Sequence, residues 1–134
     1  MERNKLVELY KKYNLEKTDV FKHQHFVILT RQGIERIAAK ENITINYEVI
    51  RCEPKFAVIK ATAYITTKPN AIIETFGSAL KGDNYKDGNC NSFYVAEMAE
   101  KRALSRAVLK LTGFYELGVF GEDESEDFKK KNIN

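Results

Sequence analysis

The sequence predicts an α+β domain in which a long C-terminal helix and one or two N-terminal helices pack against a three-stranded antiparallel sheet. Two observations support this prediction. Apolar and polar residues alternate through three consecutive segments between residues 43 and 79. Alanines then recur at helical spacing over residues 96–107. A chain of 134 residues, 43% of them hydrophobic, fits one such domain with a single core.

The N-terminal elements are expected to be two helices with an apolar segment between them. Apolar residues at helical spacing predict the first helix over residues 2–13. Residues 21–29 are apolar and are expected to form a short strand or an extended lead-in. Thr30 suits the N-cap of a second helix, which runs to Glu41 and stops at Asn42.

Three strands with short connections follow. Alternation of apolar and polar residues predicts strands over residues 43–49, 56–66 and 71–79. Turns that contain Pro54 and Pro69 separate them. Connections this short join neighbouring antiparallel strands, so the three strands form a meander.

A polar loop over residues 81–91 leads into the long helix, with Asn91 or Ser92 as its N-cap and Gly113 at its end. One broad face of this helix carries small and apolar residues: Ala96, Ala99, Ala103, Leu104, Ala107, Val108 and Leu111. The middle strand also has small residues on one face: Ala57, Ala61 and Ala63. We therefore expect the helix to pack closely against this strand.

Three cations follow one another along one edge of the alanine face. Arg102, Arg106 and Lys110 are spaced at i, i+4 and i+8, so about 6 Å separates successive residues. This distance is close to the phosphate spacing of an extended single strand, and the three residues are predicted phosphate contacts. The same spacing also occurs on an ordinary solvated helix face.

The polar face of the middle strand provides a second group of candidates. Lys60, Thr62 and Tyr64 place a cation, a hydroxyl and an aromatic ring on one face of the strand. Lys60 is a predicted phosphate contact and Tyr64 a predicted stacking platform, although a plain solvated sheet face has the same pattern. Lys81, at the start of the polar loop, completes the predicted DNA contacts.

Catalytic and metal-binding patterns are absent from the sequence. It has no nucleophile elbow, phosphate-binding loop or zinc-protease motif, so neither an enzyme nor a cofactor is expected. Residues 83–88 resemble the start of a calcium loop, but position twelve is Tyr94 where a glutamate is needed. His23 and His25 have no partner at metal-ligand spacing, so no metal is expected.

The charge of the chain is compatible with a polyanionic partner. The net charge is +3, and it rises to +5 without residues 122–134, which hold five acidic residues and three lysines. These residues are predicted to be a disordered tail after a folded domain over residues 1–121. The tail serves solubility, or it recruits a protein partner or mimics DNA.

Composition also predicts the compartment. The sequence has no apolar run long enough to cross a membrane, and its first residues have mixed charge without the apolar core of a signal peptide. Cys52 and Cys90 lie far apart, which favours reduced thiols in a cytoplasmic protein and leaves a disulfide open.

The third strand and the long helix together resemble a known superfamily. A glycine-containing strand, then a helix with a Lys-Arg-Ala-Leu core that ends near a glycine, is similar to the single-strand annealing proteins of recombination: eukaryotic Rad-fifty-two and the phage proteins Redβ, Erf and Sak. The resemblance covers roughly residues 30–118. The matching positions are Gly77, Lys101, Arg102, Ala103, Leu104 and Gly113.

The resemblance implies binding of single-stranded DNA in a positively charged groove between the hairpin and the helix, and annealing without ATP in rings or filaments. It places Lys101 and Arg102 in the groove, with Lys60 or Tyr64 beside them. The chain departs from the pattern at Ser105, where a further basic residue is common, and it is shorter than most annealing proteins.

We therefore expect a phage-type single-stranded DNA-binding protein of recombination or replication, homo-oligomeric and located in the cytoplasm of a bacterial or phage-infected cell. Two alternatives stay open. One is an OB-type DNA-binding barrel, which needs two further strands, from residues 21–29 and from beyond the long helix. The other is an oligomerisation or interaction domain that does not bind nucleic acid.

Overall fold

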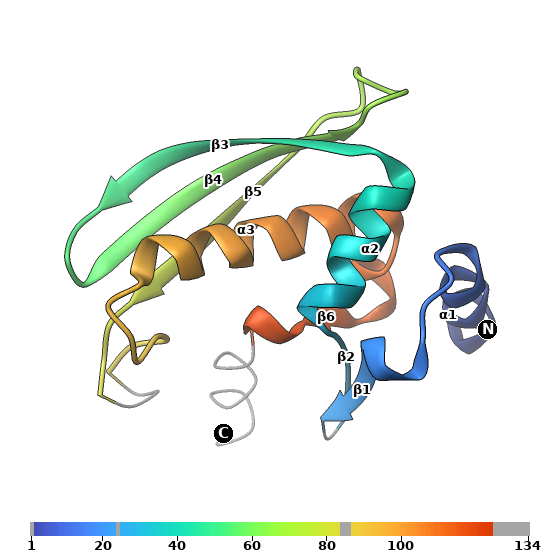
Figure 1. Cartoon of the computed structure of the whole chain (residues 1–134), viewed down its shortest axis with the longest axis horizontal. Coiled ribbons are helices and arrows are strands. Elements are labelled where there is room, and N and C mark those ends of the chain that lie inside the picture. The colour runs from blue at the N-terminus through green and yellow to red at the C-terminus, as the bar shows by residue number, and fades with distance from the viewer. Residues whose placement is uncertain (1, 24, 84–86, 125–134) are drawn as a thin grey trace.

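The structure, a computed structural model, describes residues 2–23, 25–83 and 87–124. These residues form three α-helices and two three-stranded sheets, so the predicted α+β class is confirmed. Figure 1 shows the longest helix, α3 (Val95–Thr112), along one face of the larger sheet. The smaller sheet and the other two helices lie toward the C-terminal end of α3.

The N-terminal part forms two helices with a β-hairpin between them. Thr30 caps the second helix as predicted, because its Oγ1 accepts a hydrogen bond from the Gly33 amide at 3.1 Å. Asn42 ends that helix in the left-handed conformation, with φ 53°. The elements are α1 (Glu2–Lys12), a 3₁₀ turn (Lys17–Asp19), β1 (Val20–His23), β2 (Phe26–Leu29) and α2 (Arg31–Glu41).

The smaller sheet brings together residues far apart in the chain. β1 pairs with β2 in antiparallel fashion, and β2 pairs in parallel with β6 (Val119–Gly121), which follows the long helix and a 3₁₀ turn (Tyr115–Leu117). Strands therefore exist at both places that the OB-type alternative required. They pair with one another and not with the larger sheet, so the described residues form two separate sheets and no barrel.

The larger sheet is the predicted antiparallel meander, in the order β3–β4–β5. Its strands are β3 (Ile43–Cys52), β4 (Phe56–Ile65) and β5 (Ile73–Leu80). The register between β3 and β4 shifts between Val49 and Arg51, which leaves Ile50 as an extra, bulged residue on β3.

Helix α3 packs on β4 and β5 through small residues, as predicted. Three alanines of the β4 face and three of the α3 face are fully buried: Ala57, Ala61, Ala63, Ala99, Ala103 and Ala107. Ala96, near the start of α3, is partly buried. The Thr75 hydroxyl on β5 donates a hydrogen bond to the Ala103 carbonyl at 2.7 Å. Small side chains on both elements thus allow the helix backbone to approach the sheet.

The ends of α3 agree with the prediction at one end only. Gly113 ends the helix with φ 86°, a conformation that favours glycine. The predicted N-cap at Asn91 or Ser92 is wrong, because the helix starts at Val95 after Tyr94. The Ser92 hydroxyl instead accepts a hydrogen bond from the Tyr94 amide at 3.0 Å, inside the preceding turn.

A second apolar core lies where both N-terminal helices and the smaller sheet meet the C-terminal end of α3. Tyr13 is buried there beside Phe114, with 5.9 Å between their ring centroids. The Tyr13 hydroxyl donates a 2.6 Å hydrogen bond to Glu41, and the Lys12 ammonium lies 3.0 Å from the same carboxylate. These two contacts with Glu41 connect the C-terminal end of α1 to the C-terminal end of α2.

We expect Tyr13→Phe to lower the free energy of unfolding at neutral pH by about 1 kcal/mol, since one hydrogen bond to a carboxylate is lost. The hydrogen bond from Tyr13, and next the one from Lys12, lower the pKa of Glu41 in the folded state. The stabilisation is therefore fully present when the pH is above the pKa that Glu41 has in the unfolded chain. It is lost as the pH falls through the lower pKa that Glu41 has in the folded protein. Urea unfolding at pH 7 and pH 3 measures it, and the difference between the two proteins should shrink at pH 3.

Candidate nucleic-acid interface

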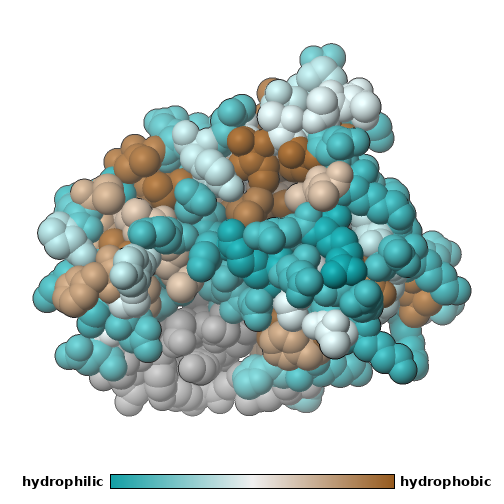
Figure 2. Space-filling model, in the orientation of Figure 1, coloured by the Kyte–Doolittle hydropathy of each residue, from teal (hydrophilic) through white to brown (hydrophobic). Residues whose placement is uncertain are grey.

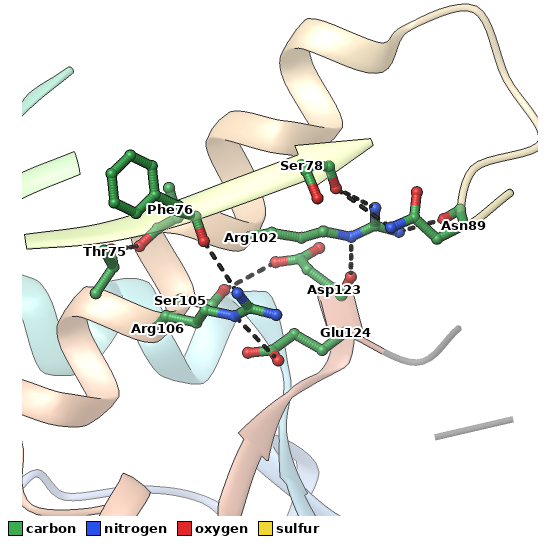
Figure 3. Close-up of polar contacts among 10 residues, drawn as sticks. Thr75, Phe76, Ser78, Asn89, Arg102, Ser105, Arg106, Asp123 and Glu124 are labelled. Carbon is green, nitrogen blue, oxygen red and sulfur yellow. Dashed lines mark hydrogen bonds and ion pairs between the residues drawn. The ribbon is translucent and has the colours of Figure 1, made fainter. Parts of the chain in front are cut away.

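Arg102, the central cation of the predicted DNA contact, lies in the interior of the structure. Only 4% of the residue is exposed. Its guanidinium donates hydrogen bonds to three carbonyl oxygens: Nη1 to Ser78 at 2.7 Å, Nη2 to Asn89, and Nε to Asp123 at 2.9 Å. These carbonyls come from β5, from the loop after it and from the segment after β6 (Figure 3).

Arg106 makes the corresponding contact one helical turn later. Its Nη1 donates to the Phe76 carbonyl at 3.0 Å, and its Nε lies 3.3 Å from the Glu124 carboxylate (Figure 3). Residues four apart on a helix rise by about 6 Å, and residues two apart on a strand by about 6.7 Å. The two arginines therefore reach alternate carbonyls along the outer edge of β5.

This geometry corrects the prediction for Arg102. The spacing that resembles the phosphates of a single strand also matches alternate carbonyls of an edge strand. In the folded protein the Ser78 carbonyl is an acceptor for the buried Arg102, so this residue does not present its guanidinium to an external phosphate chain. Arg106 donates to the Phe76 carbonyl, but a third of its side chain is exposed, and the phosphate contact expected of it stays a prediction. The position of Arg102 in a DNA groove, implied by the resemblance, is corrected by the same contacts.

The first residues of the predicted tail belong to the folded part. Residues Glu122–Glu124 form a 3₁₀ turn, in which Glu122 accepts a 2.6 Å hydrogen bond from the Arg31 amide at the start of α2. The Asp123 carboxylate accepts one from the Ser105 hydroxyl at 3.0 Å. The prediction of disorder from residue 122 is therefore wrong for these three residues. Residues 125–134, with the predicted partner-binding tail, lie outside the described residues.

At Ser105 the resemblance led us to expect a further basic residue, and the structure shows what this position contacts. The residue is buried at the contact between α3 and the segment after β6, where its hydroxyl binds Asp123. A long basic side chain at this position would have to displace the packed segment.

The other two cations of α3 lie at different places on the helix. The ammonium of Lys110 is 5.2 Å from the centroid of the Tyr115 ring, at the end of α3 that adjoins the smaller sheet. Lys101 is partly exposed, more than two helical turns closer to the N-terminal end. Because Arg102 is buried, the predicted row of three phosphate contacts is not a continuous exposed surface.

Lys60 and Tyr64 lie on the face of the larger sheet opposite to α3. Ile59, Ala61 and Ala63 on β4 are buried on the helix side, so the residues between them point to the other face. The Lys60 ammonium lies 2.7 Å from the Glu74 carboxylate, and this pairing raises the pKa of Lys60 and lowers that of Glu74. The sheet separates these residues from α3, so the expected groove between hairpin and helix does not unite them.

Lys81 lies in a group that combines cations with exposed aromatic rings. We define the end cluster as Lys55, Lys81, Phe93 and Tyr94. The Lys81 amide donates a 2.7 Å hydrogen bond to the Lys55 carbonyl, and the Lys81 ammonium lies 5.1 Å from the centroid of the Phe93 ring. Phe93 and Tyr94 are 66% and 71% exposed, although large aromatic side chains are usually mostly buried.

The end cluster carries a partly balanced charge. Asp83 is almost fully exposed, and its carboxylate lies 3.6 Å from the Lys81 ammonium. Lys55 is exposed in the turn between β3 and β4. Sequence reasoning identified Lys81 alone. Phe93 and Tyr94, two adjacent aromatic residues between the polar loop and the helix, were the signal that could have identified the rest.

The described residues contain no group of three or more histidine, cysteine or acidic residues that could hold a metal ion. Cys52 is exposed, Cys90 is buried, and both are free thiols. Among the described helices, none is long and apolar enough to cross a membrane. Comparison with protein-family models, curated proteins and solved structures yields no match to this chain.

Proposed function

We propose that the protein binds single-stranded DNA through the end cluster, as a component of recombination or replication. The observation that supports this most is the pair of exposed aromatic side chains, Phe93 and Tyr94, next to two lysines at one end of the larger sheet. Aromatic platforms and cations are the two groups that single-strand binders combine.

Each group has a distinct role in this proposal. Bases stack on Phe93 and Tyr94, which accept any base because every base has a π-face. Lys55 and Lys81 neutralise phosphates, so binding is largely independent of sequence. The preference for DNA, and the annealing of complementary strands without ATP, follow from the family resemblance and belong to the same proposal.

A titration of a labelled oligo-dT strand at several salt concentrations tests the proposal, with duplex DNA and a matching RNA strand as competitors. The single strand should bind more tightly than the duplex. The affinity should fall with salt, with a slope of about −0.7 per phosphate contacted. Lys55→Ala with Lys81→Ala removes two contacts and should make the slope shallower by about 1.4.

Phe93→Ala with Tyr94→Ala should weaken binding by about tenfold or more and leave the salt slope unchanged, since stacking does not release counterions. Lys40→Ala with Lys68→Ala is the matched control, because these two lysines are exposed elsewhere on the molecule. Absent or salt-insensitive binding of the wild-type protein would reject the proposed function. A larger loss in the control pair than in the end-cluster variants would reject this site.

A further inference from the structure

The two edge strands of the larger sheet differ in the hydrogen-bond partners of their outward-facing backbone N–H and C=O groups. On the β5 edge, Arg102 and Arg106 bind the carbonyls of Ser78 and Phe76, and the amides of Asn89 and Cys90 bind the carbonyl of Leu80. On the opposite edge, β3 pairs with β4 and with no other described strand. An edge strand with exposed N–H and C=O groups is a template for a further strand.

β3 also exposes large apolar side chains along this edge. Its last seven residues are all exposed, and Tyr47, Val49 and Ile50 are 42%, 62% and 48% exposed. Figure 2, in the orientation of Figure 1, shows hydrophobic patches among polar residues over β3. An apolar edge strand is a site of association unless it is covered.

The β-bulge at Ile50 places an acid and a base on the same face of β3. Glu48 lies opposite Lys60 and Arg51 lies opposite Val58, both of which are on the face of β4 away from α3. Residues three apart on a regular strand point to opposite faces, and the extra residue restores them to one face. Glu48 and Arg51 therefore flank Val49, which points to the other face.

This arrangement makes β3 complementary to a second, antiparallel β3. On the ladder that β3 forms with β4, Ile50 is the extra residue and takes no position of its own, so Arg51 occupies the position next to Val49. When Ile50 is also bulged in the new pair and Val49 faces Val49 of the second copy on a two-fold axis, Glu48 lies opposite Arg51 of the second copy, and Arg51 lies opposite its Glu48. On the other face, Tyr47 lies opposite Cys52 of the second copy. A two-fold axis repeats every contact, so the interface contains the pair of Glu48 with Arg51 of the other copy twice.

The neighbouring registers are unfavourable. With Glu48 on the two-fold axis, two glutamates lie directly opposite each other, and with Arg51 on the axis, two arginines do. Like charges directly opposite on paired strands are destabilising, so the charge pattern selects the register centred on Val49.

We propose that β3 pairs with β3 of a second copy of this chain, in antiparallel orientation about a two-fold axis at Val49, to form a symmetric dimer with a continuous six-stranded sheet. The dimer is independent of nucleic-acid binding. Because the contact is one strand pair and smaller than a standard interface, we expect a dissociation constant in the micromolar range.

Charge exchange tests the register in the absence of DNA. By sedimentation or light scattering over a concentration series, the wild-type chain should change from monomer to dimer. Glu48→Arg and Arg51→Glu should each weaken dimerisation by at least tenfold, because each creates two like-charge pairs. An equimolar mixture of the two variants should form a heterodimer, and the double exchange in one chain should restore the homodimer.

Melting curves of each variant check that these exposed substitutions leave the fold intact. A wild-type chain that stays monomeric up to several hundred micromolar would overturn the proposal. So would single exchanges that dimerise as the wild type does, or a mixture that stays monomeric. A larger closed ring as the smallest assembly would overturn it as well, because a two-fold contact closes at two copies.

Cross-linking gives a second measurement in a Cys52→Ser background. Val49→Cys places two thiols opposite each other on the axis, at a separation that a disulfide can span, so mild oxidation should yield a covalent dimer. Glu48→Cys is the matched control, since it faces Arg51 of the second copy and not itself. Equal cross-linking of the two variants would contradict the register.

Discussion

Replacement of Arg102 by alanine should lower the free energy of unfolding by about 3–5 kcal/mol, one of the two largest effects that we expect from any single substitution in this chain. The guanidinium is buried and satisfies the carbonyls of Ser78, Asn89 and Asp123. Alanine removes three charge-assisted hydrogen bonds and a long side chain that fills space between α3 and β5. Urea denaturation, followed by circular dichroism, measures the change.

Arg102→Lys separates the geometry of the guanidinium from its charge. A lysine keeps the positive charge but cannot match a planar fork that donates to three carbonyls from three segments, so it should recover less than half of the loss. Lys101→Ala is the matched control, because it removes a neighbouring cation that is partly exposed and should change stability by less than about 0.5 kcal/mol.

The phosphate-contact hypothesis predicts the opposite result for Arg102. A residue that only binds DNA can be replaced with little effect on the fold, and the loss then appears in the affinity for oligonucleotide. An Arg102→Ala protein that unfolds like the wild type would therefore contradict the structural role given to this residue.

The contacts of Arg102 and Arg106 also explain why the second copy is expected at β3. The two arginines bind carbonyls of β5 and so occupy that edge of the sheet, which leaves β3 as the edge that can pair with another strand.

The larger sheet and the long helix could be predicted because local patterns determine them. Alternation over residues 43–79 and small residues at helical spacing are visible in the sequence, and the structure has both elements. The parallel pairing of β2 with β6 could not be predicted. β6 has three residues, and its pairing of Val27 with Val119 depends on contacts across most of the chain.

The candidate site was harder to predict because one spacing fits two kinds of acceptor. Arg102 and Arg106 are about 6 Å apart along α3, which suits either phosphates or alternate strand carbonyls, and only the position of β5 decides between them. The sequence alone could have corrected one prediction, the groove that joins Lys60 and Tyr64 to α3. The alternation that directs Ala61 and Ala63 toward α3 also directs Lys60 and Tyr64 to the opposite face. A groove that joined those two residues to α3 was therefore inconsistent with the predicted strand itself.

Gly77→Ala should lower the free energy of unfolding by about 3 kcal/mol or more, because it separates α3 from the sheet. A Cβ atom at this position would lie 2.0 Å from the Ala99 carbonyl oxygen and 2.5 Å from the Ala103 nitrogen. Both are backbone atoms, so the helix must move as a unit. Alanine is intrinsically favoured over glycine within a strand by roughly 0.5–1 kcal/mol, and the steric cost of forcing the helix away exceeds this gain.

Ser78→Ala is the matched control for Gly77→Ala, because it changes the next residue of β5, whose side chain is exposed on the sheet face away from α3. The Arg102 contact uses the Ser78 carbonyl and stays intact, so this variant should unfold within about 0.5 kcal/mol of the wild type. Thermal and urea unfolding of both variants give the comparison. A Gly77→Ala protein as stable as Ser78→Ala would mean that α3 does not approach β5 this closely, and it would remove the basis for the buried position of Arg102 as well.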